Sequence, residues 1–263
     1  SLKKNVAGNQ VVIASKVYFN EGRLSRQAIM REIDGTLSRL GTDYLDLYII
    51  HRFDYDTPIE ETMEALHDLV KAGKVRALGA SAMYGYQFYN MQLAARDNGW
   101  TPFSAMENHY NLLYREDERE LLPICKQMKV SLMPYSPLAA GHLTRLQWKS
   151  ESLRGTTDRV AMGKYDKTEA EDMQIVKRVA ELAEKYNCKM SQIAIAWQWA
   201  KGILSPIIGA TKTQYLDDSA GAFDIKLTAE DLAYLEEPYV PHEIVGAIDK
   251  NPAQGVILLD EKK

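Results

Sequence analysis

Residues Leu45-Asp46-Leu47-Tyr48-Ile49-Ile50-His51 form a mostly apolar run that ends in a histidine. Its β-prone residues predict a buried strand. Residues 11–16 (VVIASK) follow the same pattern and end in Lys16. Buried parallel strands tolerate polar side chains mainly at their carboxyl ends, and in α/β barrels this end carries the chemistry. We therefore interpret Lys16 and His51 as candidate catalytic residues. The alternatives are a snorkelling lysine and a hydrogen-bonded core histidine.

The composition indicates a soluble globular protein with one large core. The chain has 263 residues, of which 46% are hydrophobic, and a net charge of -4. No apolar run is long enough to span a bilayer, and the mildly acidic balance gives no reason to expect nucleic acid or an anionic membrane as a partner. Cys125 and Cys188 show neither metal-ligand spacing nor a disulfide framework. Because no secretory signal opens the chain, we expect a cytoplasmic protein.

Short strands alternate with longer helical segments along the chain. This alternation predicts βαβ units and a parallel sheet. No G-x-G-x-x-G follows the first strand, so a barrel is favoured over a doubly wound dinucleotide-binding sheet. Ser25 is the expected N-cap of the first helix. Strands are expected at 11–17, 45–51, 75–80, 104–108, 131–135 and 205–209, and helices at 25–40, 58–73, 86–98, 117–129, 169–187, 191–201, from 213 and at 228–236.

The expected strands are fewer than a closed barrel of this type needs, which is eight. The opening residues Ser1–Asn5 resemble the tail of a helix. We therefore expect a single α/β domain over residues 1–263, a (β/α)8 TIM barrel that lacks its first two βα units. If nothing else supplies the two strands, the sheet is open and the edge of the 11–17 strand favours association.

Polar residues also follow the later strands. Ser81 follows the third, Glu107 closes the fourth and Tyr135 closes the fifth, while Gly209-Ala210-Thr211-Lys212 leads from the sixth into a helix. A cation at a helix N-terminus after the last strand predicts a site for a phosphate-bearing ligand. The structural alternatives are a helix cap for Ser81, a core aromatic for Tyr135 and an ordinary turn at Gly209.

Several segments resemble the aldo-keto reductase superfamily, and most closely its aryl-alcohol dehydrogenase-like branch. The resemblance implies a (β/α)8 barrel, NADPH/NADP as the cofactor, and reversible reduction of aldehydes or ketones to alcohols. It thus implies a small carbonyl or alcohol substrate, and it leaves the oligomeric state open. The segments are 11–16, 40–46 (LGTDYLD), 50–52 (IHR), 78–81 (LGAS), 108–116 (NHYNLLYRE), 134–141 (PYSPLAAG), 207–212 (IIGATK) and 235–242 (LEEPYVPH).

The resemblance assigns roles to individual residues. Lys16 and His51 match the Lys and His of a catalytic Asp-Tyr-Lys-His tetrad, in which the Tyr donates a proton, the Lys lowers the Tyr pKa and the His orients the carbonyl. Tyr135 matches the aromatic that stacks on the nicotinamide, and Ser81 and Glu107 match carboxamide contacts. We expect the polar segment 139–168 to form an inserted loop over the cofactor site. The phosphate and adenosine contacts match Ser136, Pro137, Leu138, Gly141, Ile208, Gly209, Ala210, Thr211, Lys212, Gln214, Tyr215, Asp218 and Ser219.

The sequence departs from the family pattern in three places. The tetrad Asp and Tyr have no match in it, and Tyr18 and Tyr84 are only speculative replacements. The connection at 18–22 (YFNEG) is shorter than the glycine-rich loop of close relatives. Glu107 stands where the family usually has Gln; it can still accept from the carboxamide NH2, but it adds a negative charge.

We weigh three functions. The first is an NADPH-dependent aldo-keto reductase, of which this chain is an incomplete part without an evident proton donor. The second is a non-catalytic nucleotide-binding or regulatory barrel, because the tetrad Asp and Tyr are absent. A preceding segment resembling Phe-Asp-Thr-Ala-x-x-Tyr-Gly would favour the first. The third, a metal-dependent barrel enzyme, lacks any His/Asp/Glu set with ligand spacing.

The cofactor preference depends on Lys212. Its position at a helix start predicts NADP(H) over NAD(H), because a 2′-phosphate gains both the ammonium charge and free backbone N–H groups. The family uses an acid at the position of Asp218 to hold the adenine amino group, and Tyr215 is placed to stack on the adenine.

Overall fold

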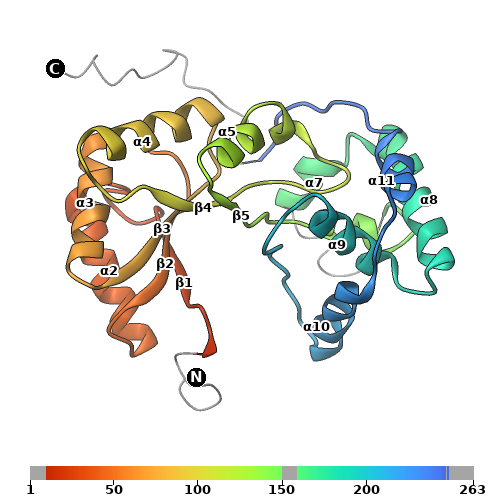
Figure 1. The fold of residues 1–263 in the computed structure, drawn as a ribbon, viewed down its shortest axis with the longest axis horizontal. Helices are drawn as coiled ribbons and strands as arrows, with labels where there is room; N and C mark the ends of the chain where they lie inside the picture. The colour runs from red at the N-terminus through yellow and green to blue at the C-terminus, as the bar shows by residue number, and fades with distance from the viewer. Residues whose placement is uncertain (1–9, 150–158, 247, 249–263) are drawn as a thin grey trace. The chain divides into compact units, whose positions relative to one another are not determined.

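The computed structural model describes residues 10–149, 159–246 and 248, and Figure 1 shows their fold. These residues cluster into two compact units. The first unit comprises residues 10–107 and 124–130, and the second comprises 108–123, 131–149, 159–246 and 248. The expected helix tail at Ser1–Asn5 lies outside the described residues, and a single domain over the whole chain stays a prediction.

The first unit is built on a parallel sheet. Strands β1 (Ala14–Val17), β2 (Leu45–Ile50), β3 (Val75–Ser81) and β4 (Phe103–Glu107) pair in this order, each parallel to the next. Helices α2 (Arg26–Leu40), α3 (Ile59–Lys71) and α4 (Gly85–Asp97) connect them and lie on one face of the sheet (Figure 1). This βα repeat is part of the (β/α)8 barrel that the sequence predicts. Within the described residues, β1 has β2 as its one neighbour.

Local sequence explains where these helices begin and end. Ser25 is the N-cap of α2, as predicted, and its side chain accepts a hydrogen bond from the Ala28 backbone N–H. Gly41 ends α2 with a left-handed backbone, a conformation that suits glycine. Glu60 and Glu61 place negative charge in the first turn of α3, where it is favourable. The apolar faces of the helices are buried, with Ile29, Ile33, Met63, Leu66 and Phe88 fully covered.

The second unit is mostly helical and packs around Trp197. The Trp197 ring lies 5.1 Å from that of Tyr110, and both side chains are fully buried. Leu143, Val179 and Leu235 belong to the same core, which joins segments far apart in the sequence. Its elements are η2 (Glu116–Arg119), β5 (Ser131–Leu132), η3 (Ala139–Thr144), α7 (Arg159–Tyr165), α8 (Glu169–Lys185), α9 (Met190–Ala200), α10 (Thr213–Ala220), η4 (Gly221–Asp224) and α11 (Ala229–Glu236); α5 (Leu121–Gln127) contains residues of both units.

The predicted strand at 205–209 is wrong, and the strand predicted at 131–135 is cut to Ser131–Leu132. The two segments share one hydrogen bond, from the Ile207 backbone N–H to the Pro134 carbonyl oxygen at 2.9 Å. Each contains a proline, Pro134 and Pro206, and a proline has no N–H to donate to a strand ladder. Residues 205–209 therefore have the apolar composition of a strand, but too few backbone N–H donors to pair as one.

Two further predictions, one of a helix and one of a loop, also need correction. The helix expected at 117–129 is divided into η2 and α5, because Glu120 between them has a non-helical backbone. The polar segment 139–168 is not a loop throughout, since it contains η3 and α7, while residues 150–158 lie outside the described residues. No helix in the described ranges has both the length and the apolar character needed to cross a membrane.

Gly79 gives a test of how tightly the inner face of this sheet is packed. A Cβ at Gly79 would lie 3.0 Å from Cγ1 of Ile49 and 3.4 Å from the carbonyl oxygen of Ala105. We expect Gly79→Ala to lower the free energy of unfolding by about 1–3 kcal/mol, because the packed neighbours must move. Urea denaturation measures this. Gly163→Ala, with no atom within 4 Å of the new Cβ, is the control and should be neutral or slightly stabilising. Equal midpoints for both variants would contradict the packing.

Candidate functional site

The sequence-predicted residues of the first unit share one face at the carboxyl end of its sheet. Lys16 lies opposite Ile49, and Ile49 lies opposite Gly79 in the strand register. Side chains alternate between the two faces along a strand, so residues two positions further on emerge on the same face. Ser81 and Glu107 are also paired in register. The polar residues that this arrangement brings to one face are Lys16, His51, Ser81 and Glu107.

Lys16 and Glu107 form an ion pair across this face. Lys16 Nζ lies 2.8 Å from Glu107 Oε1, and the Glu107 side chain is only 7% exposed. Two strands separate β1 from β4 in the sheet, and at about 4.8 Å per step a flat sheet would hold them roughly 14 Å apart. The pair therefore requires a sheet that curls inwards, as a barrel wall does. The polar face of this curled sheet is therefore concave.

His51 continues β2 beyond its last residue and carries a neutral imidazole. Its backbone N–H donates to the Val17 carbonyl oxygen at 2.9 Å, and its ring meets the Phe19 ring edge to face at 4.8 Å. Burial, together with the charges of Lys16 and Arg52, lowers the pKa of His51. At neutral pH one ring nitrogen is thus a donor and the other an acceptor. The structure gives the ring no hydrogen bond to any described residue, so the core-histidine alternative has no support.

Ser81 supports the end of β4 rather than the following helix. Its hydroxyl donates to the Glu107 carbonyl oxygen at 2.8 Å, and the residue is 1% exposed. The N-cap of α4 is Tyr84, so the capping alternative for Ser81 is wrong. The Ser81 oxygen keeps lone pairs that can accept a hydrogen bond. The end of this strand pair therefore presents acceptors, Ser81 Oγ and the Glu107 carboxylate.

Tyr135 presents an aromatic ring in the second unit. Its ring is stacked on the buried His109 ring at 5.3 Å with 8° between the planes, and Lys164 Nζ lies 4.7 Å from its centre. Its backbone N–H donates to the Asn108 carbonyl oxygen at 2.8 Å. Tyr135 itself is only partly buried, which is what a stacking surface for a ligand requires.

The loop after Tyr135 has an unusual backbone. A left-handed φ occurs at Ser136 (57°), Ala139 (47°), Ala140 (54°) and Gly141 (101°). Residues with side chains seldom adopt it, and they keep it only where the surroundings hold it. Here Asn111 Nδ2 donates to the Ser136 carbonyl oxygen at 2.9 Å, and the Gly141 N–H donates to that of Leu138 at 2.8 Å. Such strain clusters at functional sites, which supports the assignment of Ser136, Pro137, Leu138 and Gly141.

The loop at 207–212 ends in the N-terminus of α10, as the sequence predicts. Lys212 is the N-cap, and its Nζ lies 5.9 Å from the centre of the Tyr215 ring. No residue of α10 is buried, and every residue from Gly209 to Asp217 is exposed. An exposed helix N-terminus with a lysine beside it can bind an anion. Ile208, Gly209, Ala210, Thr211, Lys212 and Gln214 all lie in this exposed turn or next to it.

Two candidate residues at the other end of α10 already have partners. Asp218 Oδ2 accepts from Lys189 Nζ at 2.6 Å, and the Ser219 hydroxyl donates to the Tyr215 carbonyl oxygen at 2.7 Å. An adenine amino group would share Asp218 with Lys189. The assignment of Asp218 and Ser219 to the adenosine stays a prediction.

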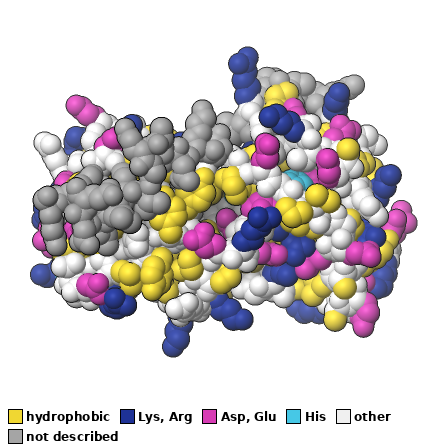
Figure 2. Space-filling view, turned by 90° about the horizontal axis from the view of Figure 1, so that it is seen from above, with side chains coloured by type: hydrophobic (Ala, Val, Ile, Leu, Met, Phe, Trp, Pro, Cys, Tyr) yellow, Lys and Arg dark blue, Asp and Glu magenta, His cyan; other side chains and the backbone are white. Residues whose placement is uncertain are grey.

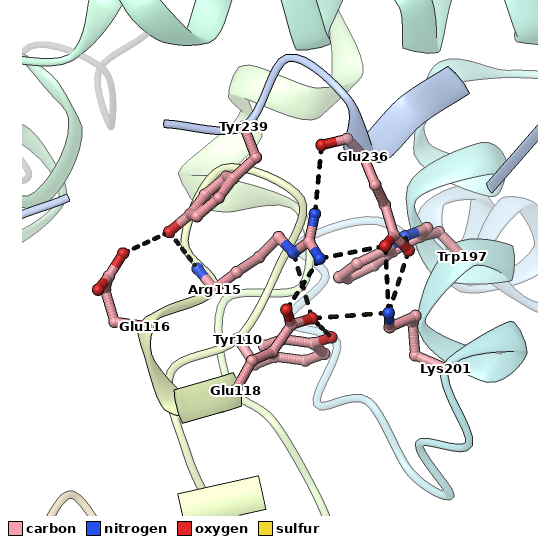
Figure 3. Close-up of polar contacts among 8 residues, drawn as sticks. All are labelled: Tyr110, Arg115, Glu116, Glu118, Trp197, Lys201, Glu236 and Tyr239. Carbon is pink, nitrogen blue, oxygen red and sulfur yellow. Dashed lines mark hydrogen bonds and ion pairs between the residues drawn. The ribbon is translucent and has the colours of Figure 1, made fainter. Parts of the chain in front are cut away.

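Sequence reasoning missed a polar network centred on Arg115 (Figure 3). Its guanidinium lies 2.8 Å from Glu118 and 3.1 Å from Glu236, and its side chain is 11% exposed. Trp197 Nε1 donates to Glu236 at 2.9 Å, and Lys201 Nζ lies 3.2 Å from the same carboxylate. The network joins the segment after β4 to α9 and α11. Its charges are thereby paired inside the second unit.

The same network holds residues 235–242. The Tyr239 hydroxyl accepts from the Arg115 backbone N–H and donates to Glu116, each at 2.8 Å (Figure 3). The His242 backbone N–H also donates to Glu116 at 2.8 Å, and His242 Nε2 lies 3.0 Å from Asp172. Two segments that carry the resemblance, 108–116 and 235–242, thus bind each other. Both segments mix aromatic with charged residues, and this is the sequence signal that could have indicated the contact between them.

The described residues give no support to a metal site. In residues 10–149, 159–246 and 248, no group of three or more His, Cys, Asp or Glu side chains could hold a metal ion. Cys125 is buried and Cys188 partly buried, and no disulfide joins them. Of the speculative proton donors, Tyr18 contacts Phe19 and Arg23, and Tyr84 stacks on Tyr86 at the start of α4.

Comparison with known proteins gives a consistent result. The model of the aldo/keto reductase family matches residues 1–239. The chain is 46% identical to an aldo-keto reductase of Fusarium vanettenii over 88% of its own length and 62% of that protein. It is 42% identical to the versiconal hemiacetal acetate reductase of Aspergillus parasiticus, over 93% of this chain and 78% of that one.

A third relative bears on the branch. A Schizosaccharomyces pombe protein, whose name places it among the aryl-alcohol dehydrogenases, is 45% identical over 87% of this chain and 64% of its own. The chain thus spans less than two thirds of the length of two of these relatives, at 62% and 64%.

Arg115 tests whether the network stabilises the second unit. We expect Arg115→Gln to lower the free energy of unfolding by about 2–4 kcal/mol, because it leaves the partly buried carboxylates of Glu118 and Glu236 with less positive charge. Urea denaturation at neutral pH is the measurement. Arg96→Gln, at an exposed arginine on α4 that pairs with Asp97, should stay within about 0.5 kcal/mol of wild type. A similarly small change for Arg115→Gln would show that the network contributes little.

His242 tests the contact with Asp172 through its pH dependence. Burial lowers the pKa of His242, but the hydrogen bond and charge of Asp172 outweigh burial and raise it overall. A raised folded-state pKa stabilises the fold fully below the ordinary value of about 6.5, and this contribution is lost as pH rises through the folded pKa. We therefore expect wild type to exceed His242→Gln in unfolding free energy at pH 6 and the gap to shrink at higher pH. A gap that widens with pH would contradict the pairing.

Proposed function

The chain belongs to the aldo/keto reductase family, and from this premise we propose that the protein reduces aldehydes or ketones to alcohols with NADPH. The observation that carries the proposal is the meeting of Lys16 and a neutral His51 at the carboxyl end of one concave sheet face. In barrels of parallel strands this is the end where reactions occur. The relatives named as reductases and aryl-alcohol dehydrogenases support the same reaction class.

We assign the catalytic contacts to Lys16 and His51. A neutral imidazole can donate a hydrogen bond to a carbonyl oxygen and so orient and polarise it. The Lys16 ammonium lies on the same face, where its ion pair with Glu107 fixes its direction. The tetrad Asp and Tyr of the family have no match in this sequence, so we assign no proton donor among its residues.

Each unit, taken by itself, presents groups of the kind that bind a dinucleotide. Ser81 Oγ and the Glu107 carboxylate offer acceptors for the carboxamide NH2 group, and Tyr135 offers a partly exposed ring. The strained loop at Ser136–Gly141 and the exposed start of α10 offer backbone N–H groups and Lys212 to phosphates. When bound, NADPH supplies the hydride. The protein residues hold it and orient the carbonyl.

The proposal is tested in two steps. Fluorescence titration with NADPH measures binding, and the loss of NADPH absorbance with a panel of aromatic and aliphatic aldehydes measures turnover. Lys16→Met and His51→Gln should lower turnover at least about 100-fold, the lower range for a group acting on proton transfer, with little change in NADPH affinity. NADPH binding without turnover of any carbonyl would favour the regulatory alternative. Failure to bind either dinucleotide would contradict both functions.

Lys212 tests the cofactor preference. Removing one charge-assisted contact to the 2′-phosphate should weaken NADPH binding by about 10- to 100-fold. Lys212→Ala should therefore lose NADPH affinity by this factor and keep its NADH affinity. Lys177→Ala, an exposed lysine on α8, is the matched control. Equal wild-type affinities for the two dinucleotides would refute the preference for NADP(H).

A further inference from the structure

Arg52, Phe19 and His51 lie together above the carboxyl ends of β1 and β2. The Arg52 guanidinium is 5.0 Å from the centre of the Phe19 ring, which meets the His51 ring at 4.8 Å. We propose that these residues form a substrate subsite for an aromatic carbonyl compound with an anionic substituent such as a carboxylate, in which Arg52 binds the anion and Phe19 contacts the ring. This inference rests on the proposed function and specifies its substrate class.

Arg52 carries a positive charge that no described residue neutralises. The atom Nε is buried without a hydrogen-bond partner, and within the described residues the guanidinium forms no ion pair. A buried donor left without a partner is unfavourable, so a ligand that supplies an acceptor is favoured there. The flat guanidinium suits a carboxylate, which it can bind through parallel hydrogen bonds.

The nearby carboxylate, Asp54, is committed elsewhere. It is 3% exposed and accepts hydrogen bonds from the Leu24 N–H at 3.2 Å, the Thr57 hydroxyl at 2.7 Å and the Asp56 N–H at 3.1 Å. Arg23 also lies 3.6 Å from it. Asp54 thus ties the loop after β1 to the loop after β2, and it forms no ion pair with Arg52. The charge of Arg52 remains available for a ligand.

Phe19 supplies an apolar surface, and its exposure to water is unfavourable unless a ligand covers it. It is 64% exposed, and Tyr18 packs edge to face on it at 5.3 Å. The loop that carries it is fixed by the Asp54 contacts and by the Thr62 hydroxyl, which donates to the Leu24 carbonyl oxygen at 3.0 Å. A fixed, exposed aromatic side chain beside His51 is suited to stack on an aryl group. Phe19 and Arg52 thus already lie against each other before a ligand arrives.

The electrostatics at His51 agree with this assignment. Lys16 and Arg52 are the positive charges that act on its imidazole, and Glu107 is already paired with Lys16. The local surroundings therefore contain one uncompensated positive charge. An anion bound at Arg52 cancels it, so binding should raise the pKa of His51. His51 thereby serves as a reporter of where the ligand binds.

Binding of benzoate and its neutral isostere benzamide tests the subsite without cofactor or turnover. Both ligands are titrated into wild type, Arg52→Gln and the control Arg96→Gln, and the His51 ring signals are followed by NMR. We expect wild type and Arg96→Gln to bind benzoate more tightly than benzamide. In Arg52→Gln, benzoate affinity should fall about tenfold or more, as for one charge-assisted contact, and benzamide affinity should stay within about twofold. Phe19→Ala, at an exposed position, should weaken both ligands.

Several results would overturn the subsite. Equal affinity for benzoate and benzamide in wild type would do so, as would an unchanged benzoate affinity in Arg52→Gln. Benzoate binding that leaves the His51 signals unshifted would place the ligand elsewhere. If Arg52→Gln fails to fold, Arg52→Lys keeps the charge, and there the loss of the planar fork should still weaken benzoate more than benzamide. Because the assay needs no NADPH, a failure of the proposed reductase activity gives a separate result.

Discussion

The ion pair between Lys16 and Glu107 is the contact on which the geometry of the site depends. It joins strands that are not neighbours, so it exists only because the sheet curls. The same curl turns the carboxyl ends of β1 to β4 towards a common centre. Glu107 holds Lys16 in a fixed direction on this face. A glutamine at this position would hydrogen-bond the ammonium but would not balance its charge.

Much of the first unit could be predicted from the sequence, because its signals are local. The N-cap at Ser25, the acids after Pro58 and the apolar run at 45–50 each act within a few residues of their position. The prediction of a strand at 205–209 was wrong for a reason that is also local. Apolar composition indicates a strand, but Pro206 and Pro134 remove the donors on which a ladder depends. Donor counting therefore has to accompany hydrophobicity when such segments are assigned.

The candidate site was predictable only in part. Lys16 and His51 were found because each closes an apolar strand, a pattern that depends on the parallel sheet alone. Glu107 was not predicted as the partner of Lys16. A Glu in place of the usual Gln can be recognised as part of an ion pair only when the curvature of the sheet is known. Arg115 and Glu236 are 121 positions apart, and no pattern in either segment names the other. The segments at 108–116 and 235–242, which carry part of the resemblance, therefore also contact each other in the fold.

The length of chain between partners in the second unit has a consequence for synthesis on the ribosome. Contacts between neighbouring strands of the first unit join residues such as Ser81 and Glu107, 26 positions apart, whereas His242 meets Glu116 across 126 positions. Translation adds about 5–20 residues per second, so the Glu116 segment is made several seconds or more before its last partner. During that interval Arg115 has Glu118 as a partner but not Glu236, and Glu116 lacks the hydrogen-bond donors of Tyr239 and His242. The first unit can fold while it emerges from the ribosome. The second unit can complete its fold only after residues 235–242 have been made.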